Sequence, residues 1–240
     1  MSVLELTNVS KSFGEGTAAV HALARVTLSV EPGAMVAVMG PSGAGKSTLL
    51  TIAGGLEDPD EGEVLVGGES LSRMSRNDRA RLRRRAIGYV FQDYNLLPGL
   101  TAAENVSLPL ELDGVPARKA RAAGMAALEQ LGLAGRAGHY PDQLSGGERQ
   151  RASIARAVVA DRRLLLADEP SGALDSANGE AVMDLIRAAC DRGVAALVVT
   201  HDAHLAERAN RIVSIKDGHL VSQAGRTSVP RWDAPAEGNR

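Results

Sequence analysis

Residues 40–48, GPSGAGKST, combine glycine, lysine and serine at a spacing that can hold a phosphate chain. They match the pattern G-x-x-x-x-G-K-[ST], with Gly40, Gly45, Lys46 and Ser47 at the fixed positions. In this pattern the glycines let backbone N–H groups wrap the β-phosphate, the lysine reaches the β- and γ-phosphates, and the serine hydroxyl ligates Mg²⁺. An apolar run precedes the loop and a helical pattern follows it, as the pattern requires. The sequence therefore predicts a nucleoside triphosphate site that is formed by the whole loop: Gly40, Pro41, Ser42, Gly43, Ala44, Gly45, Lys46, Ser47 and Thr48.

Such a loop also needs a carboxylate for Mg²⁺ and a group that places the attacking water. The run RLLLADEP brings an apolar strand to Asp168 and Glu169. Because ligands of open α/β sheets lie at the carboxyl ends of strands, we predict that Asp168 binds Mg²⁺ and that Glu169 is the general base. An Asp–Glu pair at a strand end is usually only a polar loop start, but the four apolar residues before it favour the catalytic interpretation. In the next turn, SGALD, Asp175 is predicted to belong to the same site.

Two further strand ends carry polar side chains. Gln92 follows IGYVF and is predicted to offer a neutral oxygen to Mg²⁺ or to the water, in a catalytic role. His201 follows ALVVT and is predicted to touch the γ-phosphate or the attacking water. A structural role remains open for His201, and with His204 it forms an H-x-x-H pair that could be mistaken for a metal site. Phe13 is the best-placed ring for stacking on adenine, although a place in the core is an open alternative.

The composition limits the class of protein. The chain has 240 residues, 44% hydrophobic and 23% charged, with a formal net charge of −2, which gives no general attraction to nucleic acid or anionic membrane. Cys190 is the only cysteine, so no intrachain disulfide can form, and a reducing cytosol is expected. The longest apolar runs fall far short of the ~20 residues that span a bilayer, and no signal-peptide pattern is seen. A soluble protein is expected, with any membrane role exerted through a partner.

The pattern along the chain predicts an α/β fold. Alternating residues at 3–13 and 21–30 are typical of half-buried antiparallel strands. Buried strands are predicted at 34–40, 87–91, 163–168 and 194–200, with helices at 46–54, 117–131, 147–160 and 176–190. This alternation implies a mostly parallel sheet with the N-terminal strands in a separate antiparallel layer. Residues 93–160 are expected to form a helical subdomain, and the tail at 226–240 is expected to be disordered.

A second glycine turn precedes a helical pattern at residues 144–151, LSGGERQR, and would also suit an anion. With it, the chain resembles the nucleotide-binding subunits of ABC transporters from residue 3 to about 222. The family motifs occur in order: Phe13 as the A-loop aromatic, GPSGAGKST as Walker A, Gln92 as the Q-loop, LSGGE as the signature, LLLADE as Walker B, SGALD as the D-loop and His201 as the switch histidine. The resemblance implies one ABC domain over 1–225 with a P-loop NTPase (RecA-like) core, which hydrolyses ATP with Mg²⁺ to drive transport.

The resemblance also suggests why there are two glycine turns. In this family two domains close head to tail, so that the signature of one covers the ATP bound to Walker A of the other. Ser145, Gly146, Gly147 and Glu148 would then act in trans, in a homodimer. Glu148 stands where glutamine is common, Phe13 replaces the commoner tyrosine, and SGALD replaces the frequent TGNLD. No catalytic position is lost, so two equivalent active sites are expected.

The stretch IGYVFQDYNLLPGLTAAENVSLPLELDG is similar to ATPases of the lipoprotein-releasing, macrolide-export and cell-division group (LolD-, MacB- and FtsE-like). That similarity implies an integral membrane permease of the FtsX or MacB kind, contacted by residues 93–112, and a cytoplasmic location on the inner face of the membrane. A solvated connection between subdomains is the alternative for this segment.

The basic run RNDRARLRRR (76–85) could bind nucleic acid or lipid headgroups, but without interleaved aromatic residues it is more typical of a solvated helix face. No nucleic-acid partner is expected. The alternative to a transporter is an ABC-type ATPase of DNA repair or chromosome maintenance, which would need a long coiled coil between Walker A and the signature. A GTP switch would need an N-K-x-D motif, which the chain lacks.

Overall fold

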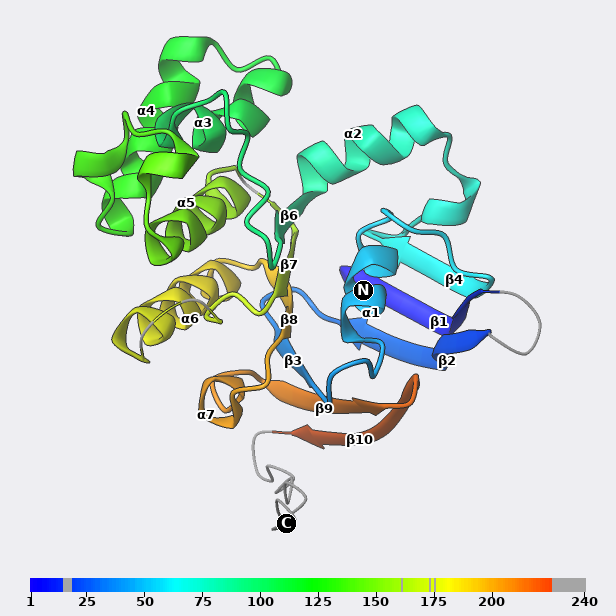
Figure 1. The fold of residues 1–240 in the computed structure, drawn as a ribbon. Coiled ribbons are helices and arrows are strands. Elements are labelled where there is room, and N and C mark those ends of the chain that lie inside the picture. Colours follow the sequence, from blue (N-terminus) through cyan, green and yellow to red (C-terminus); the bar gives the residue numbers. More distant parts are fainter. Residues whose placement is uncertain (15–18, 161, 173, 175, 226–240) are drawn as a thin grey trace.

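The computed structural model describes residues 1–14, 19–160, 162–172, 174 and 176–225, and Figure 1 shows the fold. Its centre is a six-stranded sheet in the order β10-β9-β3-β8-β7-β6. The strands are β3 (Met35–Met39), β6 (Ile87–Val90), β7 (Leu164–Asp168), β8 (Ala195–Val199), β9 (Arg211–Lys216) and β10 (His219–Gly225). All neighbours pair in parallel except β9 and β10. The predicted mostly parallel α/β sheet is thus confirmed.

A second, antiparallel sheet is built from the N-terminal part of the chain, as predicted. Its order is β2-β1-β4-β5, with β1 (Leu4–Phe13), β2 (Val20–Val30), β4 (Glu61–Val66) and β5 (Glu69–Ser70). The sequence analysis did not predict four of the strands: β4, β5, β9 and β10. The run EGEVLV of β4 begins with two glutamates around a glycine, so it has no apolar run to mark it.

The core lies on both faces of the central sheet. Along β3, Met35 and Ala37 face the cluster that includes α6 (Ser176–Asp191), whereas Val36 and Val38 face the cluster shared with the antiparallel sheet and α1 (Lys46–Ala53). Because both faces are covered, β7 and β8 are buried at every position, which is why they read as continuous apolar runs.

Residues 93–160 contain helices and, in their described part, no strand. They form α3 (Ala102–Leu112), α4 (Ala117–Gln130) and α5 (Gly146–Val158), which pack on one another at one end of the sheet (Figure 1). The basic run forms α2 (Arg76–Ala86), which has no buried residue, so a helix with exposed faces is confirmed. The short α7 (Ala203–Ala206) follows β8. None of the described helices is long and apolar enough to cross a membrane. The predicted tail, 226–240, lies outside the described residues.

Candidate nucleotide site

The phosphate-loop pattern lies between β3 and α1, where the backbone passes close to two other strands. A Cβ at Gly40 would lie 2.1 Å from the carbonyl oxygen of Ile215, and a Cβ at Gly45 would lie 2.0 Å from that of Ala22. Both glycines also have positive φ, 154° and 103°. Only glycine fits at these positions. Gly45 is the N-cap of α1, and no side chain caps this helix end, so its first amide groups are suited to an anion.

Lys46 of the loop and Asp168 of β7 are the two charged groups beside Ser47. The Nζ atom of Lys46 donates to the carbonyl oxygens of Gly40 and Pro41, both at 2.8 Å. Asp168, at the end of β7, is only 8% exposed, and burial raises the pKa of its carboxyl, partly offset by a hydrogen bond from Ser47 and by the charge of Lys46. A buried carboxylate beside a serine hydroxyl is a pair of hard oxygen donors of the type that Mg²⁺ prefers.

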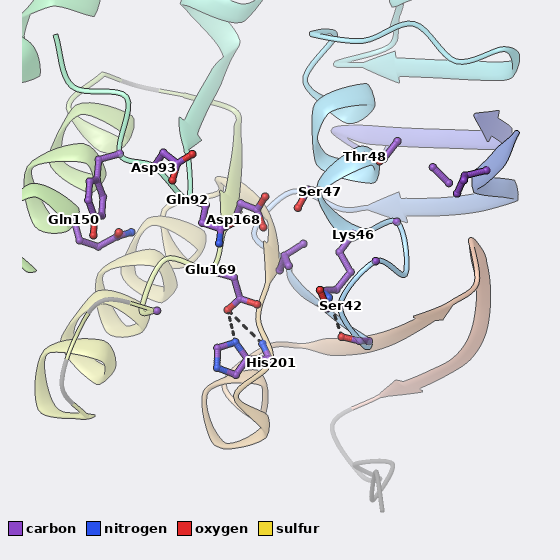
Figure 2. Close-up of a pocket in the computed structure, with 18 residues that line it drawn as sticks. Ser42, Lys46, Ser47, Thr48, Gln92, Asp93, Gln150, Asp168, Glu169 and His201 are labelled. Atoms are coloured by element: carbon purple, nitrogen blue, oxygen red, sulfur yellow. Dashed lines mark hydrogen bonds and ion pairs between the residues drawn. The ribbon is translucent and has the colours of Figure 1, made fainter. Parts of the chain in front are cut away.

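Glu169 is held in an unusual backbone conformation. Its φ is 47°, which is uncommon for a residue with a side chain, and its amide donates to the Val199 carbonyl at 3.0 Å. This geometry turns the carboxylate away from the strand and toward His201. Its Oε2 atom lies 2.9 Å from His201 Nδ1, and a dashed line marks this contact in Figure 2. The Glu169 side chain is 17% exposed and that of His201 is 73% exposed, so the pair lies at the solvent edge of the site.

A cavity of about 680 Å³ joins these groups (Figure 2). Eleven of the residues predicted for the site line it: Gly40, Ser42, Gly43, Gly45, Lys46, Ser47, Thr48, Gln92, Asp168, Glu169 and His201. Pro41 and Ala44 of the same loop are not among the lining residues, and Ala44 is buried. The arrangement can hold a phosphate chain, a divalent cation and a water beside one carboxylate.

The second glycine turn stands at the start of α5. Ser145 is the N-cap of α5, and its hydroxyl accepts a hydrogen bond from the Glu148 amide while the Glu148 carboxylate accepts one from the Ser145 amide. Ser145, Gly146, Gly147 and Glu148 are all absent from the cavity lining. The LSGGE turn therefore does not line the cavity of its own chain, although Tyr94, whose hydroxyl would lie 3.6 Å from a Cβ at Gly146, does.

Residues 23–172 match the family model described as ABC transporter. The chain belongs to the ABC transporter family. It is 45% identical over 227 residues to the macrolide export ATP-binding/permease protein MacB of Brucella melitensis biotype 1, which covers 95% of this chain and 35% of that protein. It is 44% identical over 236 residues to the pyoverdine export ATP-binding/permease protein PvdT of Pseudomonas syringae pv. tomato, with 98% and 36% covered. The cassette thus spans about a third of the length of the curated relatives that it matches.

Solved structures of cassettes have the same fold. The dimeric structure of a post-hydrolysis state of the ATP-binding cassette MJ0796, bound to ADP and Pi, superposes with a TM-score of 0.89 at 38% identity and covers 94% of this chain and 100% of that one. A second dimeric structure of MJ0796, described as a bacterial ABC transporter cassette, gives a TM-score of 0.89 at 39% identity. The present chain is therefore an ABC-type ATPase domain.

Phe13 ends β1 and is 47% exposed, so the alternative that it is a core residue is wrong. It does not line the cavity itself, but Val20, its partner across the antiparallel pair, does. Lys11 Nζ lies 5.5 Å from the centroid of the Phe13 ring. Asp175 lies outside the described residues.

The cavity also contains residues that the sequence analysis missed. Asp93 and Tyr94 line it next to Gln92, and adjacency in the chain could have indicated them. Gln150 lines it from α5, two residues beyond the LSGGE turn, and is 1% exposed. Its Nε2 atom has no hydrogen-bond partner within the described part of the chain, and its burial depends on packing that no local pattern encodes.

Glu148 gives the cassette a pH-dependent helix cap. The Ser145 amide, with smaller contributions from the Ser145 hydroxyl and from Arg136 at 2.9 Å, lowers the pKa of this carboxyl below its usual value of 4.5. Because the folded-state pKa is depressed, the carboxylate stabilises the fold above pH 4.5, and this contribution disappears as the pH falls through the folded-state pKa.

Glu148→Gln keeps an oxygen that can accept from the Ser145 amide but removes the negative charge, so it is expected to lower the free energy of unfolding at pH 7 by about 0.3–1 kcal/mol, the magnitude of a charge at a helix N-terminus. Near pH 3 the variant and the parent should be equally stable. Urea unfolding at the two pH values measures this, with Glu129→Gln on an exposed part of α4 as the matched control. An equal loss at both pH values would show that the charge of Glu148 has no part in the cap.

Proposed function

We propose that this chain is the ATP-hydrolysing subunit of an export system, in which two copies close around two ATP–Mg²⁺ and drive an integral membrane permease. One observation carries the proposal. The cavity gathers the phosphate loop, Asp168 and the Glu169–His201 pair, whereas the LSGGE turn lies outside it. A site with groups for phosphate binding and proton transfer, and a second anion-binding turn that does not line it, is suited to completion by a second copy.

The loop and Lys46 would bind the phosphates. The amide groups at the start of α1 and the ammonium group of Lys46 would neutralise the β- and γ-phosphates, and Ser42, Gly43 and Thr48 line the same wall. Lys46 Nζ now donates to two carbonyl oxygens at 2.8 Å, and phosphate oxygens would replace them as acceptors when the nucleotide binds. Phe13, whose strand partner Val20 lines the cavity, would offer a ring face to adenine.

The residues present fit a magnesium ion. Ser47 and Asp168 would hold it, with the side-chain oxygen of Gln92 as a third donor from the cavity wall. When bound, it would polarise the phosphate oxygens and offset their charge. The desolvation that raises the pKa of Asp168 supports this assignment, because a buried carboxylate gains more from a cation than an exposed one does.

Proton transfer is assigned to Glu169. Its carboxylate stands at the cavity edge, where it would accept a proton from the water that attacks the γ-phosphate. His201 positions it through the contact at 2.9 Å and lines the same cavity, where it would sense the γ-phosphate. Asp175 is proposed to border the same site between the two copies.

The second copy would supply Ser145, Gly146 and Gly147. They begin α5, where the amide groups and the helix dipole favour an anion, and Glu148 fixes the turn through the capping box. Hydrolysis would then remove the phosphate that both copies hold, so that the pair opens. The dimeric structures of the similar cassette MJ0796 support this assembly.

The permease is proposed to dock in a groove between α2, β6 and α3, called here the α2–α3 groove. It has a volume of about 500 Å³ and includes four residues of the segment 93–112: Asn95, Leu108, Pro109 and Leu112. Its rim carries Leu56 and Leu112, which are 45% and 58% exposed. Exposed apolar side chains around a hollow favour a protein partner over a solvated connection. The names of the relatives MacB and PvdT, which include a permease, support the export type.

The docking prediction can be tested with a photo-crosslinking amino acid at Leu112. In cells of the source organism it should crosslink to an integral membrane protein. The matched control is the same probe at Met125, an exposed apolar residue of α4 outside the groove, which should not give that product. Crosslinks only to soluble proteins, or the same product from both positions, would contradict the permease assignment and favour a non-transport ATPase.

A further inference from the structure

The α2–α3 groove has a buried cation in its wall. Arg162 lies between α5 and β7 and is 7% exposed. Its Nε and Nη1 atoms have no hydrogen-bond partner among the described residues, which do not include Asp161. Burial lowers the pKa of its guanidinium, and Asp113 offsets this only in part. Buried donors without acceptors lower the stability of the fold, so we expect Arg162 to find its acceptor in another molecule.

The other arginines of the groove have acceptors within the chain. Arg83 donates to the Gly55 carbonyl at 2.7 Å, Arg84 to the Asp113 carboxylate at 2.6 Å, and Arg156 to the Tyr94 carbonyl at 2.8 Å. The lining holds four arginines and no aspartate or glutamate among its described residues. The groove is therefore apolar at its rim and positively charged within.

We infer that the α2–α3 groove receives a carboxylate side chain from the docking segment of the permease, and that the Arg162 guanidinium is its receptor. This inference rests on the proposed docking of a permease. An arginine fork can bind a carboxylate through two parallel hydrogen bonds, which would satisfy the two donors that lack acceptors. Leu56, Leu112 and the stacked rings of Tyr89 and Phe91, 4.1 Å apart, would cover the apolar face of the same segment. The occupant is thus an amphipathic segment with one acidic residue among apolar ones.

A docking role and a structural role make opposite predictions for thermal stability. If Arg162 has its acceptor only in the permease, Arg162→Met should leave the melting temperature of the isolated chain unchanged or raise it, because an uncompensated buried charge is replaced by an apolar side chain of similar length. If Arg162 has an acceptor within its own chain, the same change should lower the melting temperature.

The binding test uses the full chain with the photo-crosslinking probe at Leu112. Arg162→Met should lower the yield of the membrane-protein crosslink by at least about tenfold, on the magnitude of breaking a buried charge pair at an interface. Arg163→Met is the matched control, since the neighbouring Arg163 is exposed and does not line the groove, and it should leave the yield unchanged. The crosslinked peptide should contain an aspartate or glutamate, and its replacement by the amide should add no further loss in the Arg162→Met background.

The outcomes separate two failures. If the parent chain gives no membrane-protein crosslink, the proposed function fails. If the parent gives the crosslink but Arg162→Met keeps its yield, lowers the melting temperature, or adds to the effect of the acidic substitution, the inference about Arg162 fails while the docking site stands.

Discussion

Replacing Glu169 with glutamine is expected to slow ATP hydrolysis by at least about 100-fold, because the amide cannot accept a proton from the attacking water. The change keeps the size of the side chain, and its carbonyl oxygen can still accept a hydrogen bond from His201. ATP binding should therefore persist, and the closed dimer should accumulate because its phosphates are not removed. Phosphate release, nucleotide binding and size-exclusion chromatography with ATP measure the three effects.

The control for this variant is Glu207→Gln, an exposed glutamate that does not line the cavity. It should hydrolyse ATP at the parental rate. Turnover close to that of the parent in Glu169→Gln would remove Glu169 from the role of base. A parallel loss of ATP binding would instead indicate that Glu169 supports the cavity as a structural residue.

The parts of the fold that could be predicted are those whose burial leaves a local mark. The apolar runs at β3, β7 and β8 are continuous because helices or a second sheet cover both faces of these strands. In α4, α5 and α6 the buried apolar residues recur with the period of a helix. The strands β4 and β9 escape a local analysis because part of their pairing is with the distant strands β1 and β3. Arg211 of β9 pairs with Val36 of β3, far away in the chain.

The site divides in a similar way. The phosphate loop was predictable because backbone collisions restrict its residue types, as at Gly40 and Gly45. The strand-end residues Asp168 and His201 were predictable because parallel strands bring their carboxyl ends to one edge. Gln150 and Arg162 were not, since each becomes significant only through burial without an acceptor. In the sequence, a glutamine and an arginine are not distinguished from residues that are exposed to solvent.

The separation of the LSGGE turn from its own cavity leads to the second large expected effect. Lys46→Ala should remove the cation that contacts the phosphates, and Ser145→Arg should fill the turn and place a bulky side chain where the phosphate of the other copy would lie. Each variant alone is expected to lose hydrolysis by at least about 100-fold, the magnitude of deleting one preorganised electrostatic contact.

Mixing the two variants should restore activity. In a mixed dimer the intact phosphate loop of one copy faces the intact LSGGE turn of the other, so one of the two sites is complete. With random pairing in a symmetric dimer, half of the dimers are mixed, and about a quarter of the wild-type rate is expected if the sites act independently.

A chain that carries both substitutions is the matched control for this mixture. Combined with either single variant it forms no complete site, so it should restore nothing, although it has the same surfaces and the same tendency to pair. Ser145 also caps α5, and for that reason the melting temperature of Ser145→Arg must be measured alongside. If folded Ser145→Arg and Lys46→Ala fail to complement each other, each LSGGE turn acts on the nucleotide of its own chain. The distance between the turn and the cavity would then have to close by a movement within one cassette, and not by the arrival of a second one.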